Sequence, residues 1–177
     1  MVEQNLSGEM YCDDDDLLKA LLYNNIYGVD INEEAIDVTI FSLYLTVLDY
    51  KDPKSLSTFT LPNLKGTNLF VSDFFDDEQL KGLRDISFDF IIGNPPWGNV
   101  KSGLHLEYCK KNGHLDKQQN NEICRSFIFR VKDFCQSHTT CCFILHSKLL
   151  YNQKQPSKRF RDFLLQKTKI HSIIEMS

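Results

Sequence analysis

A tetrapeptide with the groups needed to hold an amino group lies near the middle of the chain, at Asn94-Pro95-Pro96-Trp97. The Asn94 side chain offers a carbonyl acceptor, and Pro95 lacks an N–H but keeps a carbonyl that its fixed φ orients. Pro96 holds Pro95 in extended geometry and so stiffens the turn. Trp97 supplies a flat apolar face. These groups could accept two hydrogen bonds from an exocyclic NH2 group while the indole stacks on the ring that carries it.

The apolar segment 88–93 leads directly into this tetrapeptide and predicts a buried strand. A purely structural turn that begins at Asn94 would use the same residue types. From ordinary residue usage, an Asn, Asp or Ser followed by Pro-Pro-aromatic arises by chance in roughly one chain in a hundred of this size. Its place directly after a predicted strand therefore favours a binding role over a turn alone.

Two further predicted strands end in aspartates, at Asp30 and at Asp73. In open α/β sheets, ligands bind beyond the carboxyl ends of the strands. Asp30 could accept hydrogen bonds from vicinal ribose hydroxyls, with Ile31 against a nucleoside base. Asp73 could accept a hydrogen bond from an adenine amino group, with Phe74 packed on the ring. Each aspartate alone is more often a strand-end or capping residue, but the three strand ends in order on one chain favour a site.

Strands and helices alternate along the chain, which implies a mostly parallel α/β sheet covered on both faces. Asn32 is a good N-cap for the second helix. Residues 98–120 are polar and aperiodic, and we predict a long loop there. The predicted helices are 17–24, 33–47, 121–137 and 157–167, and the predicted strands are 26–31, 68–73, 88–93, 139–145 and 170–176.

The bulk composition describes one globular domain: 177 residues, of which 42% are hydrophobic and 25% are charged. No segment approaches the about 20 apolar residues of a membrane span, and the start is too polar for a signal peptide, so we expect no membrane partner. The six cysteines include no C-x-x-C pair, which favours reduced thiols in a cytoplasmic protein. We expect no metal; a zinc site from His105, Cys109 and His114 is the alternative.

The net charge of −4 is unfavourable for a free-standing DNA-binding protein, but the charges are unevenly distributed. Residues 13–16 are four consecutive aspartates, whereas basic residues dominate from residue 148 onward. That basic segment could contact phosphates. The solvated side of a helix is the more common reason for such a segment, and we favour it.

The three strand ends together resemble the S-adenosylmethionine-dependent N6-adenine DNA methyltransferases, in particular modification enzymes of restriction–modification and phage-defence systems with Asn-Pro-Pro-Tyr-type motifs. The resemblance extends from about residue 25 to the end of the chain. It implies that Asp30 binds the ribose of S-adenosyl-L-methionine and that Asp73 binds its adenine. It also implies that Asn94 to Trp97 form the catalytic motif, with Trp97 in place of the commoner Tyr or Phe.

The chain also departs from this family, because no Gly-rich motif precedes the strand that ends at Asp30. In family folds that motif ends the first, central strand. We therefore expect an incomplete Rossmann-like methyltransferase sheet that lacks this strand, in a partial catalytic domain over residues 1–177 with no target-recognition domain. Unpaired strand edges would then invite pairing into a homodimer.

The expected function is transfer of a methyl group to adenine N6 of double-stranded DNA, with the target base flipped out of the duplex. The alternatives within enzymes are an RNA adenine or a protein glutamine amide as substrate. We expect the isolated chain to be inactive, and a role as a folding fragment or interaction module is the alternative outside catalysis. A nicotinamide-binding Rossmann domain is disfavoured because the chain has no G-x-G-x-x-G.

Overall fold

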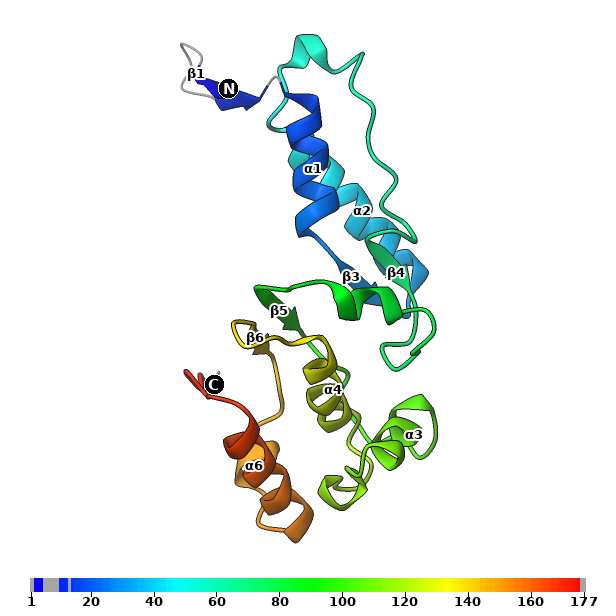
Figure 1. Cartoon of the computed structure of the whole chain (residues 1–177), viewed down its shortest axis with the longest axis vertical. Coiled ribbons are helices and arrows are strands. Elements are labelled where there is room, and N and C mark those ends of the chain that lie inside the picture. Colours follow the sequence, from blue (N-terminus) through cyan, green and yellow to red (C-terminus); the bar gives the residue numbers. More distant parts are fainter. Residues whose placement is uncertain (1, 5–9, 13, 176–177) are drawn as a thin grey trace. The chain divides into compact units, whose positions relative to one another are not determined.

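The computed structural model describes residues 2–4, 10–12 and 14–175, and the side chains from residue 11 onward within these ranges. The chain divides into two compact units, Met1–Phe74 (unit 1) and Phe75–Ser177 (unit 2). Figure 1 labels helices and strands of both. Among the described residues, no helix is both long enough and apolar enough to cross a membrane.

Unit 1 contains two helices, an antiparallel pair of strands, β1 with β2, and a parallel pair, β3 with β4. Asp14 caps α1 by accepting a hydrogen bond from the backbone N–H of Leu17, at 2.9 Å. Asn32 caps α2 by accepting from the N–H of Glu34 at 2.8 Å, which confirms the predicted N-cap. The elements are β1 (Val2–Gln4), β2 (Met10–Cys12), α1 (Asp15–Asn25), β3 (Gly28–Asp30), α2 (Glu33–Leu48) and β4 (Leu69–Val71).

The core of unit 1 is aliphatic and lies between the two helices and the segment that leads into β4. The amide of the buried Asn68 donates to the carbonyls of Tyr23 and Ile26, both at 2.9 Å, and so fixes the end of α1 beside the start of β4. Strands β3 and β4 are parallel, with Gly28 opposite Leu69. The buried apolar residues of this core are Cys12, Leu18, Leu22, Ile36, Val47, Leu64 and Leu69.

Unit 2 contains the second parallel pair, β5 with β6, and helices that pack on one another. Arg125 is fully buried; it donates to Glu122 at 2.6 Å and to the hydroxyl of Ser157 at 2.7 Å, which ties α4 to α6. The elements are η2 (Lys81–Asp85), β5 (Phe90–Gly93), α3 (Leu104–Lys111), η3 (Leu115–Lys117), α4 (Ile123–Val131), η4 (Lys132–Phe134), β6 (Thr140–Phe143), α5 (Lys148–Tyr151) and α6 (Gln155–Lys167).

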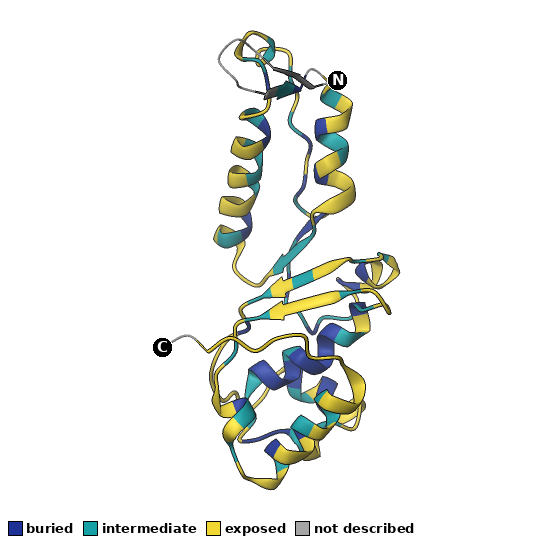
Figure 2. Cartoon of the chain, turned by 90° about the vertical axis from the view of Figure 1, so that its left-hand side faces the viewer, coloured by how far each residue is buried: buried dark blue, intermediate teal, exposed yellow. Residues whose placement is uncertain are grey.

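The predicted mixture of helices and parallel strands is confirmed, and the strands form short separate sheets. The two parallel pairs are β3 with β4 and β5 with β6; in the part of the chain that the structure describes, neither β3 nor β5 has a second partner strand. Phe90 and Ile92, on one face of β5, are 73% and 78% exposed. Figure 2 draws exposed residues in yellow, and yellow covers much of the strands. Whether a further strand belongs beside these pairs stays a prediction.

Two of the predicted elements are wrong. Residues 170–175 form no strand, and Met176, the last residue of the predicted strand, lies outside the described residues; Ile173 and Ile174 are 61% and 83% exposed, so no described strand buries this apolar segment. The predicted loop 98–120 contains α3 and the turn η3. Helix α3 buries His105, Tyr108 and Cys109 at helical spacing, and these residue types hid the apolar face from a hydropathy pattern.

Candidate active site

The two aspartates predicted to contact a cofactor lie at the same edge of unit 1. Asp30 is the last residue of β3 and stands opposite Val71, the last residue of β4. The N–H of Ser72 donates to the carbonyl of Asp30 at 2.9 Å, so the pairing continues one residue past β4. Asp73 follows directly. The structure therefore brings Asp30 and Asp73 together beyond the carboxyl end of one parallel pair, where α/β proteins bind ligands.

Asp30 is exposed, and its local structure orients the carboxylate. One oxygen, Oδ1, accepts a hydrogen bond from the backbone N–H of Asn32 at 2.8 Å. The other oxygen therefore remains available to accept a hydrogen bond from a ligand. Ile31 beside it is 73% exposed, which leaves a large apolar side chain next to an oriented carboxylate. This combination suits a ribose with its attached base.

Asp73 and Phe74 are partly buried, unlike Asp30 and Ile31. Ser72 is buried, and its hydroxyl donates to the carbonyl of Asp73 at 3.0 Å, which restrains the backbone at this position. A Cβ at Gly28 would lie 2.8 Å from Cδ2 of Leu69, so a larger residue there would require the Leu69 side chain to shift. The edge that carries both aspartates is thus held by local hydrogen bonds.

The predicted catalytic tetrapeptide follows β5 in unit 2. The N–H of Ile144 donates to the carbonyl of Gly93 at 3.1 Å, so pairing with β6 continues to the residue before Asn94. Pro95 is buried, whereas Asn94, Pro96 and Trp97 are exposed, and Trp97 is 59% exposed. The turn therefore presents its amide and its aromatic face to solvent while one proline anchors it.

Backbone hydrogen bonds also hold the chain after the turn. Gly98 has a φ of +136°, a conformation that favours glycine, and its carbonyl accepts from the N–H of Ile123 at 3.1 Å. Val100 donates to the carbonyl of Asn121 at 3.1 Å. The tetrapeptide is therefore fixed between β6 on one side and the start of α4 on the other. Such preorganisation is what a positioning site requires.

His146 contacts Trp97 and was given no role in the sequence analysis. Their ring centroids lie 5.9 Å apart at an interplanar angle of 60°. The backbone N–H of Lys148 lies 3.2 Å from Nδ1 of His146, and Nδ1 is therefore assigned as an acceptor. His146 follows β6 as Asn94 follows β5, and the two strands pair in parallel. That relation between neighbouring strand ends is the signal that could have identified it.

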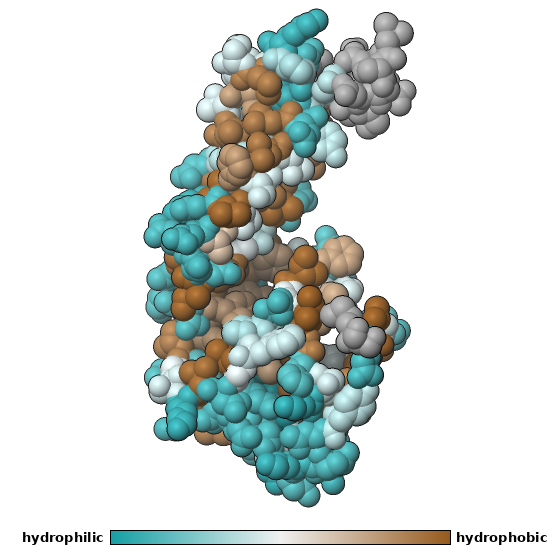
Figure 3. Space-filling view, turned by 180° about the vertical axis from the view of Figure 1, so that it is seen from behind, coloured by the Kyte–Doolittle hydropathy of each residue, from teal (hydrophilic) through white to brown (hydrophobic). Residues whose placement is uncertain are grey.

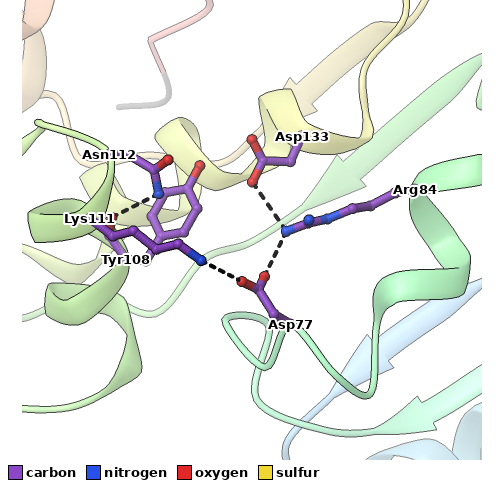
Figure 4. Close-up of a pocket in the computed structure, with 6 residues that line it drawn as sticks. All are labelled: Asp77, Arg84, Tyr108, Lys111, Asn112 and Asp133. Atoms are coloured by element: carbon purple, nitrogen blue, oxygen red, sulfur yellow. Dashed lines mark hydrogen bonds and ion pairs between the residues drawn. The ribbon is translucent and has the colours of Figure 1, made fainter.

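A charged cluster in unit 2 also escaped the sequence analysis (Figure 4). Asp77 lies 2.6 Å from Arg84 and 2.7 Å from the buried Arg130, with Lys111 at 3.6 Å. Partial burial raises the pKa of Asp77, but the positive charge of Arg130 and the two other cations outweigh it and hold the pKa below its usual range. The cluster lines an open cavity of about 310 Å³. Its carboxylates are all ion-paired, which indicates a structural role.

The residues of the zinc alternative have packing roles instead. Nδ1 of His105 lies 3.0 Å from the hydroxyl of Ser126, and the Cys109 thiol donates to the same hydroxyl at 3.4 Å. His114 stacks on Phe129, with ring centroids 4.3 Å apart. The described residues contain no group of three or more potential ligands that could hold a metal ion.

The strand-end residues thus fall into two sets, each held within its own unit: Asp30 with Asp73, and Asn94 to Trp97 with His146. Parallel strands that end in acidic residues and in an Asn-Pro-Pro-aromatic turn are the pattern from which the sequence predicts a methyltransferase. The comparison with known families agrees, because residues 24–177 match the Eco57I restriction-modification methylase. The chain belongs to this family of restriction–modification methylases. No curated protein matches the chain.

Proposed function

We propose that this chain supplies the cofactor-binding and target-binding residues of an enzyme that methylates adenine N6 in double-stranded DNA, within a restriction–modification or phage-defence system. The observation that carries the proposal is the Asn94–Trp97 turn, which is exposed at the end of β5 and anchored on both sides. Family membership supports a methyltransferase of this kind.

In this proposal S-adenosyl-L-methionine binds at the carboxyl edge of β3 and β4. Asp30 accepts hydrogen bonds from the ribose hydroxyls with the oxygen that Asn32 leaves available, and Ile31 covers the base. Asp73 and Phe74 hold the adenine of the cofactor. The fit rests on the exposed carboxylate beside an exposed apolar side chain. When bound, the cofactor supplies an electrophilic methyl group on a sulfonium.

The target adenine is flipped out of the duplex in the proposed complex, since its amino group is unreachable inside the base stack. The Asn94 side-chain oxygen and the Pro95 carbonyl accept hydrogen bonds from the amino group and favour its pyramidal, nucleophilic form. Trp97 stacks on the base. The burial of Pro95 fixes the direction of its carbonyl. Catalysis then depends on positioning and on preorganised dipoles.

The charge of unit 2 favours a nucleic acid as the substrate. Unit 2 has 16 basic and 11 acidic residues, a formal charge of +5 with histidines neutral. On α6, Lys158 and Arg159 are exposed, and a groove of about 540 Å³ beside this helix is lined by Lys117, Arg159 and Lys167 together with Asp116 and Asp162. Cations that line a groove can contact a phosphate backbone. We therefore prefer DNA to a protein glutamine.

The remaining parts of the proposal concern the setting of the chain. Without the Gly-rich strand, we expect the isolated chain to be inactive and the activity to belong to the intact enzyme. We place that enzyme in the cytoplasm, where the six free cysteines would remain reduced. The open edges of β3 and β5 would also allow two copies to pair as a homodimer.

The decisive test is Asn94→Ala in the intact enzyme, with Asn99→Ala as a matched control on an exposed asparagine five residues later. Because a preorganised polar group contributes about 10²–10³ to a rate, transfer of tritiated methyl groups to DNA should fall by about that factor in Asn94→Ala. Calorimetric titration should show unchanged affinity for S-adenosyl-L-methionine. Asn99→Ala should behave as the wild type. Normal DNA methylation by Asn94→Ala would refute the assignment.

Two further measurements test the substrate and the cofactor edge. Tritium transfer to DNA, RNA and protein in parallel separates the three substrate classes, and we expect incorporation into DNA. Asp73→Ala in the intact enzyme should weaken cofactor binding while the Asn94→Ala variant retains it. Equal cofactor affinity in the Asp73→Ala variant and the wild type would remove Asp73 from the proposed cofactor site.

A further inference from the structure

Two thiols in unit 2 lie close enough to react with each other. Cys135 follows η4 directly, Cys141 lies in β6, and their Sγ atoms are 3.5 Å apart. All six cysteines of the chain are free, and Cys12, Cys109 and Cys124 are buried. Neither Cys135 nor Cys141 has a part in the proposed methyl transfer.

The turn between the two cysteines is ordered by its own hydrogen bonds. The N–H of Gln136 donates to the hydroxyl of Thr139 at 2.8 Å, and the N–H of Thr139 donates back to the carbonyl of Gln136 at 3.2 Å. The Thr139 hydroxyl also donates to the carbonyl of Phe88 at 2.7 Å. A rigid turn keeps the two sulfur atoms near each other, and this raises their effective concentration.

The surroundings of the two thiols shift their pKa values in opposite directions. The hydrogen bond with the Cys141 thiol lowers the pKa of Cys135, partial burial opposes this shift, and the charge of Lys132 adds to it against the charge of Asp133. The same hydrogen bond, together with burial, raises the pKa of Cys141. Cys135 is therefore the more acidic thiol of the pair and Cys141 the less acidic one. A partly exposed thiol of lowered pKa beside a second thiol is the arrangement of an oxidisable site.

We propose that Cys135 and Cys141 form a reactive dithiol site that two-electron oxidants, such as peroxides, convert to an intrachain disulfide. The Cys135 thiolate attacks a peroxide oxygen, the O–O bond breaks, and hydroxide leaves as Cys135 becomes a sulfenic acid. The Cys141 sulfur then attacks the Cys135 sulfur, the S–O bond breaks, and the Cys141 proton leaves with the hydroxyl group as water. Two thiols lose two electrons, and one peroxide is reduced to water.

The disulfide requires the sulfur atoms to approach by about 1.5 Å, since the S–S bond is about 2.05 Å long. The exposure of Cys141 leaves its side chain room for this adjustment. Cys142 is exposed as well, but successive residues of a strand point to opposite faces, so its thiol is directed away from Cys135. Cys142 is thus an accessible control thiol next to the reactive one.

The test treats the full 177-residue chain with hydrogen peroxide, blocks the remaining thiols by alkylation, and maps tryptic peptides by mass spectrometry. One peptide, residues 133–148, contains Cys135, Cys141 and Cys142 because no Lys or Arg lies between its ends. We expect this peptide to lose two hydrogens and to carry a single alkyl group, on Cys142. Reduction with dithiothreitol should restore three alkylation sites.

Single-cysteine substitutions show whether Cys135 and Cys141, and no other pair of cysteines, form the disulfide. Cys142→Ser should close the disulfide at the wild-type rate, whereas Cys135→Ser and Cys141→Ser should each abolish it. At neutral pH, Cys135→Ser should also lose the fastest thiol reaction with a chromogenic disulfide, and a Cys141→Ala variant should slow that reaction. Far-UV circular dichroism of each variant checks that it is folded. Alkylation of all three cysteines after peroxide, or a cross-link that includes Cys142, would overturn the proposal.

Discussion

The two units of this chain have opposite charges, although the chain as a whole is nearly balanced. Unit 1 has 4 basic and 13 acidic residues, a formal charge of −9, while unit 2 has a formal charge of +5. The net charge of −4, which is unfavourable for DNA binding, is the sum over both units and hides the positive charge of unit 2. In the proposed function, the acidic unit holds a cofactor that carries a positive sulfonium, and the basic unit faces the DNA. Each unit therefore has the charge that suits its proposed ligand.

The cores of the two units also differ, in the kinds of side chain that they bury. The buried core of unit 1 is mainly aliphatic, and it is joined by one buried cation, Lys51, which lies 2.5 Å from Asp15. Unit 2 instead buries two arginines, Arg125 and Arg130, among aromatic rings. Burying a charge is costly unless its partners are retained. Unit 2 should therefore be the more sensitive of the two to loss of a charge and to pH.

The largest expected effect comes from removing the buried cation of each unit. Arg130 pairs with Asp77 at 2.7 Å and Asp133 at 3.0 Å and lies over two aromatic rings. Arg130→Met should destabilise unit 2 by about 2–3 kcal/mol, below the usual cost of breaking a buried pair because both carboxylates are partly exposed. Lys51→Met loses one partly exposed partner and should destabilise unit 1 by about 1–2 kcal/mol.

Urea unfolding followed by two signals measures both effects. The single tryptophan, Trp97, lies in unit 2 and reports on that unit. Its fluorescence should report the Arg130→Met change, while far-UV circular dichroism reports the two units together. Lys51→Met should leave the fluorescence transition in place. A shift of that transition by Lys51→Met as large as by Arg130→Met would remove the distinction between the two cores.

The pH dependence of stability should separate the units next. All five histidines lie in unit 2. Burial lowers the pKa of His114 below its ordinary 6.5, and the charges of Lys117 and Lys132 lower it further. Between pH 6.5 and this lower value the unfolded state binds a proton that the folded state does not, so unit 2 loses stability as the pH falls.

Unfolding followed by Trp97 fluorescence at several pH values between 7.5 and 5 checks this. His114→Phe keeps a ring for stacking on Phe129 and should reduce the slope. Unit 1 has no histidine, so hydrogen exchange of its peptides should be insensitive to this pH change after correction for the intrinsic rate. A slope unaffected by His114→Phe would assign the pH dependence elsewhere.

The features that could be predicted from the sequence are those set by neighbouring residues. The Asn32 cap, the strand that leads to Asn94 and the strand that ends at Asp30 all depend on residues within a few positions. The contact of Trp97 with His146 could not be predicted, because it depends on the pairing of β5 with β6 across about 50 residues. Whether the strand-end residues act as proposed remains a prediction.

Both wrong predictions concern the burial of an apolar face, because a helix or strand needs a neighbouring element that covers this face. Helix α3 was missed because its buried face is made of His105, Tyr108 and Cys109, which pack against Ser126 and neighbouring rings. Residues 170–175 have the composition of a strand, but in the described chain they pair with no other strand. Composition alone therefore fails to predict the helix α3 and wrongly predicts a strand at residues 170–175.

The smallest expected effect concerns the apolar stripe on α2, formed by Val38, Phe41 and Leu45, which are 65%, 61% and 47% exposed. Figure 3 shows hydrophobic side chains in brown on the surface of unit 1 and a broad hydrophilic surface in teal on unit 2. Since Phe41 buries little area, Phe41→Ser should change the stability of unit 1 by less than about 0.5 kcal/mol in dilute solution.

Ile36→Val is the matched control for this last prediction, because Ile36 lies on the same helix and is only 3% exposed. Removal of one buried methyl group should cost about 1 kcal/mol, more than the change of a whole exposed ring at Phe41. Urea unfolding followed by circular dichroism at two protein concentrations measures both. A cost above about 1 kcal/mol for Phe41→Ser that grows with concentration would show that copies of the chain cover the stripe on each other. The stripe on α2, and not only the open strand edges, would then be a site of self-association.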